Sequence, residues 1–167
     1  MRLLAFIGAL AIIIALFAGV YFFGGYYSVA ATQADPPPVA WALIKVRMAS
    51  VDRQATVRPP AGFDAPDKVQ AGAKTFLAAG CTNCHGGPGV DWQKFSEGLH
   101  PDPPDLKDVV PNREPRHLFW VVKNGINMTG MPAFGAGIKD ADIWPLVAFL
   151  KKLPEVKDED FKAWTAK

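Results

Sequence analysis

The residues best suited to chemistry form one short run, Cys81-Thr82-Asn83-Cys84-His85. Two thiols three positions apart lie on one helical turn, where they can add to the two vinyl groups on neighbouring pyrroles of a haem. His85 then directs its imidazole at the iron as the proximal ligand. The spacing is therefore typical of covalent c-type haem attachment, with Cys81, Cys84 and His85 holding the group.

Three other kinds of site use the same residue types. A thioredoxin-like redox pair follows a strand in a βαβ unit, whereas an Ala-rich helical segment, residues 69–79, precedes Cys81. A zinc site requires a fourth ligand, but the chain has only two cysteines, and we expect His100 and His117 to be ordinary solvated or capping residues. A disulfide between Cys81 and Cys84 closes too small a loop to add much stability. Haem attachment is the favoured interpretation.

An iron that carries electrons without binding small molecules requires a sixth ligand, and Met128 and Met131 are the candidates. Both lie in a loop between two predicted helices, and a thioether is a suitable soft ligand. Met131 is preferred because Pro132 stiffens the loop on one side and Gly130 permits close approach on the other. We expect Met128 to be a packed apolar side chain.

The elements that must position these residues are helices. Three are predicted: over residues 65–79, over residues 114–124, and from about Asp142 onwards. Asp64 can cap the first, Gly125 suits the left-handed position after the second, and Pro145 requires the third to begin within one turn of it. Seven side chains are candidate walls of a haem pocket: Trp92, Phe95, Leu106, Phe119, Trp120, Ile126 and Phe134.

The first segment of the chain is apolar, and residues 3–27 contain no charged side chain. About 25 residues make roughly 37 Å of helix, enough to cross a hydrocarbon core of about 30 Å. A cleaved signal peptide is the alternative, because small residues at 29–34 resemble cleavage sites, but the apolar part of a signal is shorter, about 7–15 residues. We therefore predict a retained anchor, with Arg2 in the cytoplasm and everything after Tyr27 exported.

A spacer follows, in which Asp35 and the prolines at 36–38 are expected to exclude helix. From Trp41 to about Thr56, apolar residues recur at helical spacing and form one stripe. This stripe can lie on the membrane surface, pack on the following domain or touch a partner subunit. The predicted division is an anchor at 1–28, a spacer with a juxtamembrane amphipathic helix at 29–61, and a helical domain at 62–167.

Overall composition limits the class of protein. The chain has 167 residues, 15 Gly and 15 Pro, which favours one loop-rich domain with an appendage. Its formal net charge of +2 is too small for the clustered positive face of a nucleic-acid binder.

Three stretches, residues 81–85, 99–106 and 119–134, together resemble the class I c-type cytochromes. The similarity is greatest to small, membrane-anchored, monohaem proteobacterial members and covers about residues 62–154. It implies an all-α class I cytochrome c fold around one covalent haem c, with iron bound by His85 and Met131.

The resemblance also implies two internal contacts. Gly72 and Phe76 of the first helix of the domain are expected to cross Phe149 of a later one. A backbone carbonyl is expected to hold the Nδ1–H of His85, and either Pro88 or the Pro103-Pro104 pair can supply it.

The function that follows is single-electron transfer rather than catalysis, because a six-coordinate iron has no open site for a small-molecule substrate. Covalent haem attachment takes place outside the cytoplasm, so the expected location is the bacterial inner (cytoplasmic) membrane, crossed once, with the haem domain in the periplasm. The expected partners are redox proteins, in particular membrane-bound respiratory or dehydrogenase complexes.

Two alternatives remain open from the sequence. The chain can be a cytochrome c subunit permanently held in a larger respiratory or dehydrogenase complex, relaying electrons from its catalytic subunit. It can also be a thiol–disulfide oxidoreductase that uses Cys81 and Cys84.

Overall fold

The computed structural model describes residues 1–166, and within them the secondary structure is helical apart from an isolated bridge between Gly87 and Val90. This confirms the predicted all-α architecture. The chain divides into two compact units, Met1–Gln33 and Ala34–Lys167, so the spacer helix groups with the domain that follows it. The finer division into segments 1–28, 29–61 and 62–167 stays a prediction.

The first unit contains helix α1, Arg2–Phe23, which is 22 residues long. Its length corresponds to about 33 Å, and its composition is apolar enough to cross a membrane. No acidic residue lies in its first turn and no basic residue in its last. The helix ends at Gly24, whose N–H donates to the carbonyl of Val20.

Helix α2, Pro37–Gln54, begins inside the proline run, earlier than the predicted start near Trp41. Proline is tolerated there because the first turn of a helix has no intrahelical acceptor for its N–H groups. The two ends of the predicted apolar stripe differ in their exposure to solvent. Val51 and Ala55 are buried against the rest of the second unit, whereas Trp41 is 64% exposed.

The core of the second unit is the crossing of α3, Pro66–Ala78, with α7, Asp140–Lys152. An added Cβ at Gly72 would overlap the carbonyl of Pro145 and lie 2.8 Å from the Cβ of Phe149, so only glycine permits this approach. Phe76 packs on Phe149 with ring centroids 5.2 Å apart. The implied contact of Gly72 and Phe76 with Phe149 is therefore confirmed.

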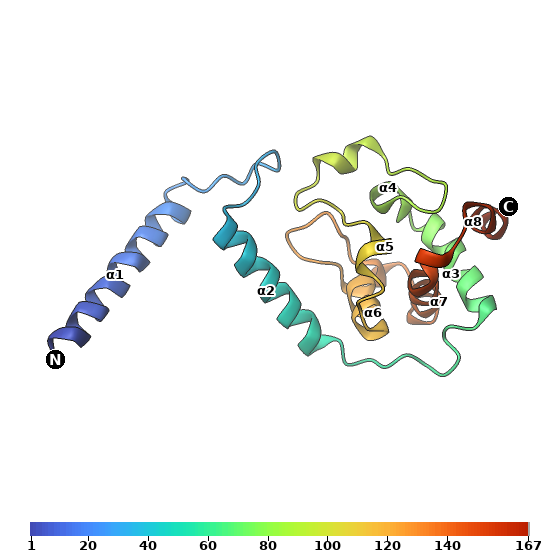
Figure 1. Cartoon of the computed structure of the whole chain (residues 1–167), viewed down its shortest axis with the longest axis horizontal. Helices are drawn as coiled ribbons and strands as arrows, with labels where there is room; N and C mark the ends of the chain where they lie inside the picture. The colour runs from blue at the N-terminus through green and yellow to red at the C-terminus, as the bar shows by residue number, and fades with distance from the viewer. Residues whose placement is uncertain (167) are drawn as a thin grey trace. The chain divides into compact units, whose positions relative to one another are not determined.

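Two further helices complete the packing (Figure 1). Helix α6, Pro115–Asn124, contacts α7 and α2, and α8, Asp158–Thr165, contacts α3. The α6 bounds match the predicted helix, and Gly125 after it has φ 68°, as its proposed left-handed position requires. Short helical turns connect these elements: α4, Thr82–His85; η1, Lys94–Gly98; α5, Leu106–Val109; η2, Phe134–Ala136; and η3, Leu153–Glu155.

One predicted helix cap and one predicted helix start were wrong. The N-cap of α3 is Ala65 and makes no side-chain cap hydrogen bond, so Asp64 does not cap it. Helix α7 begins at Asp140, which places Pro145 in its second turn. Proline removes only the hydrogen bond to the carbonyl of Ala141, and that residue is exposed, so water can replace the lost donor.

Candidate haem site

The predicted site residues meet at one cavity of the second unit. Its volume is about 540 Å³, and Cys81, Cys84, His85 and Met131 all line it. Pockets that hold cofactors and other small molecules commonly measure about 300–1,000 Å³. The residues that were expected to bind haem are thus brought together from two segments about 50 residues apart, around a space of suitable size.

The haem-attachment run is positioned by the end of α3 and the single turn α4. Gly80, at φ 75°, reverses the chain after α3, and the N–H of Cys81 donates to the carbonyl of Phe76 at 3.1 Å. The N–H of His85 then donates to the carbonyl of Cys81 at 3.0 Å. This one turn places both cysteines and His85 on the same wall of the cavity.

The ring of His85 is oriented by the backbone. Its Nδ1 lies 3.0 Å from the carbonyl oxygen of Pro104, which can only accept a hydrogen bond. Nδ1 therefore carries the proton, and Nε2 is left with its lone pair for a metal. Of the two proline candidates, the contact identifies Pro104.

Burial in the cavity lowers the pKa of His85, although the Pro104 carbonyl and the carboxylate of Asp105 act in the opposite direction. A lowered pKa favours the neutral imidazole, which is the form that binds a metal. Burial also raises the pKa of the Cys81 thiol to about 11. At neutral pH this thiol is held in its protonated form, which is a poor nucleophile.

The loop that carries Met131 is fixed by short-range hydrogen bonds. The N–H of Met131 donates to Thr129 Oγ1 at 3.1 Å, and the N–H of Ile126 donates to the carbonyl of Met131 at 3.2 Å. A Cβ on Gly125 would lie 2.8 Å from that same carbonyl. Gly130 approaches Leu99 closely, since a Cβ there would lie 2.8 Å from Leu99 Cδ1. The loop thus requires glycine at position 125, where an added Cβ would meet backbone atoms.

Met128 was expected to be a packed side chain, and this prediction was wrong. It is 87% exposed, has φ 58° and does not line the cavity. The positive φ follows from the tight turn, in which the N–H of Met128 donates to Asn127 Oδ1. Of the two methionines, only Met131 lies at the cavity.

Four of the seven predicted walls line the cavity: Phe95, Leu106, Ile126 and Phe134. The other three do not. Trp92 is exposed, and Phe119 stacks on Trp144 in the core with ring centroids 4.3 Å apart. Trp120 lies beside Phe119 along a separate small pocket. Apolar composition alone did not distinguish the pocket walls from the core.

The sequence analysis missed several lining residues: Arg47, Met48 and Val51 of α2, together with Arg113 and His117. The helical spacing of 47, 48 and 51 was a usable signal for the first three. His117 was expected to be solvated or capping, and this was wrong because it is only 8% exposed. Its Nε2 has no hydrogen-bond partner among the described residues and lies 3.5 Å from Asp52 Oδ1.

The donor set and the cavity fit a covalently bound haem. Two cysteines can form thioethers, the neutral His85 offers a nitrogen, Met131 offers a thioether sulfur, and most lining side chains are apolar. Among residues 1–166, no group of three or more His, Cys, Asp or Glu side chains is placed to hold a bare metal ion. The haem interpretation is thus consistent with the chemistry of the site.

Comparison with known proteins supports the same conclusion. Neither the curated proteins nor the solved structures gave a match. The family model described as cytochrome C oxidase, cbb3-type, subunit III matches residues 67–150, which run from α3 to α7 and include Cys81, His85 and Met131. Because this match spans half of the chain and contains the whole cavity wall from α4 to the methionine loop, the chain belongs to that family and contains a cytochrome c domain, whose family implies covalent haem c and electron transfer.

Proposed function

We propose that this protein transfers single electrons as a membrane-anchored, monohaem c-type cytochrome whose iron is bound by His85 and Met131. The observation that carries the proposal is the convergence of Cys81, Cys84, His85 and Met131 on one cavity. Neither methionine ligation nor anchoring follows from family membership alone, so each needs its own support.

Each of these residues has a distinct role in the proposal. Haem c, when bound, supplies a one-electron couple between ferric and ferrous iron. Cys81 and Cys84 hold the group covalently, Nε2 of His85 binds the metal, and the Pro104 carbonyl keeps that nitrogen free of its proton. The Met131 sulfur would be the second protein ligand of the iron, which would raise the reduction potential relative to a second histidine.

The apolar cavity contributes a second property. Apolar side chains such as Leu99, Ile126 and Leu150 line it, and with haem bound they would keep water away from the iron. A dry surrounding limits the solvent rearrangement that accompanies a change of charge, and it controls the potential of the metal. This environment suits rapid electron exchange with a docked protein.

Helix α1 supports the proposed location. It is long and apolar enough to span a bilayer. Covalent haem attachment outside the cytoplasm then places the second unit on the periplasmic side of the bacterial inner membrane. The proposed partners are membrane-bound respiratory or dehydrogenase complexes, because tethering raises the effective concentration of the domain near proteins in the same membrane.

A second candidate function is that of a subunit permanently held in a larger oxidoreductase complex. The family description favours it, because it names a subunit of an oxidase. Size measurement after extraction in mild detergent distinguishes the two: a free carrier migrates alone, whereas a subunit brings stoichiometric companions.

Thiol–disulfide exchange is the third alternative, and the site disfavours it. A reactive cysteine needs a lowered pKa, but burial raises that of Cys81 to about 11. The described residues also lack the βαβ unit of thioredoxin-like proteins.

The proposal is tested on the full chain produced in a host that attaches c-type haem. We expect the mass of the chain to increase by that of one haem, and this increase to be lost when Cys81 and Cys84 are both changed to Ala. We also expect a reduced-minus-oxidised spectrum typical of a low-spin c-type centre. A mature chain with no added mass and with free thiols would overturn the proposal.

A further inference from the structure

Helix α2 precedes the matched family region, which begins at residue 67, yet it forms part of the cavity. Arg47, Met48 and Val51 line that space and lie within about one turn of the helix. We propose that α2 is an integral wall of the haem site and that Arg47 binds the propionate carboxylates of the haem. This inference rests on haem binding as proposed above, and it assigns a role to a segment outside the family domain.

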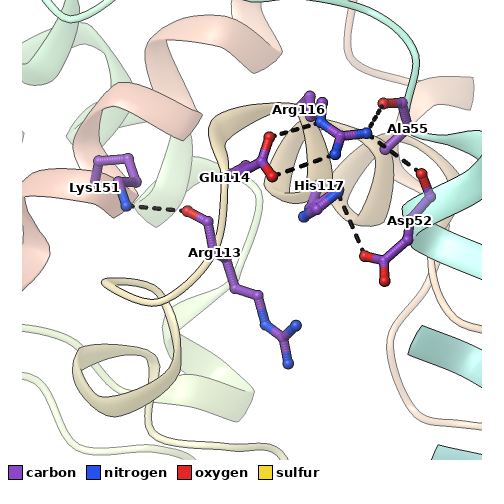
Figure 2. Close-up of polar contacts among 7 residues, drawn as sticks. All are labelled: Asp52, Ala55, Arg113, Glu114, Arg116, His117 and Lys151. Carbon is purple, nitrogen blue, oxygen red and sulfur yellow. Dashed lines mark hydrogen bonds and ion pairs between the residues drawn. The ribbon is translucent and has the colours of Figure 1, made fainter. Parts of the chain in front are cut away.

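The end of α2 is attached to α6 by a polar cluster, which we call the α2 latch: Asp52, Ala55, Glu114, Arg116 and His117. Arg116 Nη1 donates to the carbonyl of Ala55 at 2.9 Å and to that of Asp52 at 3.3 Å. Carbonyls at the end of a helix lack intrahelical partners, so a guanidinium there satisfies them and complements the helix dipole. Figure 2 shows Arg116 reaching from α6 to these two residues.

Glu114 orients this guanidinium. Arg116 Nε donates to Glu114 Oε2 at 2.7 Å and Nη2 donates to Oε1 at 3.3 Å, a two-pronged contact that fixes the plane of the group. On the inner side, Val51 and Ala55 are buried. The last turn of α2 is thus held by both apolar packing and directed hydrogen bonds.

Charge inside the cavity indicates what Arg47 binds. Besides histidines, the charged side chains that line the cavity are Arg47, Arg113 and Asp102. Neither the Arg47 nor the Arg113 guanidinium makes a hydrogen bond or ion pair within residues 1–166, although both residues are partly buried. A guanidinium that lines a cavity can pair with an anion bound there, and its planar fork matches a carboxylate.

A haem carries two carboxylates, which supply the missing anions. Arg47 and Arg113 come from different elements, α2 and the loop before α6, so a shared group between them would join these elements. The latch and Arg47 then act together: Arg116 holds the C-terminal turn of α2, and Arg47, about two turns earlier, contacts the haem.

The expected effect on the reduction potential has a definite sign. Reduction adds an electron to the site, and a nearby positive charge stabilises the reduced form. Arg47→Gln is therefore expected to lower the potential. It also leaves a propionate without its cation, which raises that carboxyl's pKa and makes the potential depend more strongly on pH.

The experiment uses the full-length holoprotein in detergent and compares Arg47→Gln with Arg53→Gln. Arg53 lies on the same helix, is exposed and does not line the cavity, so it is a matched control for the loss of one charge. We expect a lower, more pH-dependent potential for Arg47→Gln, an unchanged one for Arg53→Gln, and recovery with Arg47→Lys. Equal shifts in the two Gln variants, or none, would overturn the assignment of Arg47.

The latch is tested separately with Arg116→Gln. We expect faster hydrogen–deuterium exchange of the amides of residues 37–54, together with a shift of the potential in the direction found for Arg47→Gln. Faster exchange with an unchanged potential would show that α2 is not part of the haem surroundings. If the Arg47→Gln protein does not accumulate, Arg113→Gln provides an independent test of the propionate site. An unchanged reduction potential in the Arg113→Gln variant would contradict the proposal that Arg47 and Arg113 bind the propionates.

The experiments distinguish failure of this inference from failure of the proposed function. If the wild-type chain carries no haem, the proposed function fails. If haem is attached and its iron is six-coordinate, but the reduction potential is unchanged in the Arg47→Gln and Arg116→Gln variants, only the proposed role of α2 fails.

Discussion

Pro104 acts on the site through its backbone carbonyl and not through its side chain. Its carbonyl, 3.0 Å from His85 Nδ1, decides which ring nitrogen is free for iron. The run Cys81–His85 was predictable from spacing because all its members lie on one helical turn. The resemblance limited the partner of His85 to Pro88 or the Pro103-Pro104 pair, and the sequence could not decide between them because Pro104 lies 19 residues away across a loop.

A substitution of Met131 tests its proposed role as an iron ligand. Met131→Leu removes the proposed axial sulfur but keeps an apolar side chain of similar size. We expect haem to remain attached, the potential to fall and carbon monoxide to bind where the wild type does not. Visible spectroscopy with and without carbon monoxide measures this.

Met128→Leu is the matched control, because Met128 is exposed and lies outside the cavity. It should leave the spectrum and the potential unchanged. Carbon monoxide binding to the Met128 variant but not to the Met131 variant would reverse the ligand assignment.

Glu114 provides a pH-dependent prediction. Its hydrogen bond with Arg116 lowers the pKa of the Glu114 carboxyl. A depressed pKa in the folded state adds stability above the ordinary glutamate pKa of about 4.3, and this stability is lost as the pH falls through the lower folded value. We expect the difference in unfolding free energy between wild type and Glu114→Gln to be largest near neutral pH and to shrink in acid.

Denaturant titrations at several pH values measure this difference. In an Arg116→Gln background the Glu114 carboxyl has lost its partner, so the pH-dependent difference should disappear. If the same pH dependence remained in the Arg116→Gln background, a group other than Arg116 would be responsible for the lowered pKa of the Glu114 carboxyl.

At the level of helices, the predictions succeeded where local chemistry sets the boundary. Helix α6 has Pro115 in its first turn and Gly125 after its last, and both bounds agree with the structure. The start of α7 was wrong because Pro145 was treated as a first-turn residue, whereas the helix begins at Asp140, with acidic side chains in its first turn that suit the helix dipole. His117 was missed because its burial depends on tertiary contacts: it lines the cavity and lies 3.5 Å from Asp52 of α2.

The α3–α7 crossing predicts a strong effect of one methyl group. Gly72→Ala would force a Cβ against the Pro145 carbonyl and Phe149, so the two helices must separate. Overpacking of this kind typically costs about 1–3 kcal/mol. Chemical denaturation of the holoprotein should show this loss.

Gly137→Ala is a suitable control, because a Cβ there meets nothing within 4 Å and the residue has φ −119°. Its unfolding free energy should stay close to that of the wild type. A stable Gly72→Ala protein would contradict the tight crossing.

For the whole molecule, the prediction concerns α1. If α1 is a retained anchor, the full chain stays in the membrane fraction after a high-salt wash and begins at Met1. Replacing residues 1–33 with a cleavable export signal should release a soluble haem protein with the same spectrum. N-terminal sequencing of the native protein that begins at Thr32 or Asp35 would show instead that the leader is removed.

The connection between Phe23 and Pro37 sets a spatial limit on any such anchored protein. About 13 residues span at most about 45 Å when fully extended. In the proposed anchored protein, the second unit would therefore begin no more than about 45 Å from the end of α1. The length of this linker would set the greatest distance from the lipid surface at which the domain could meet the redox centre of a partner.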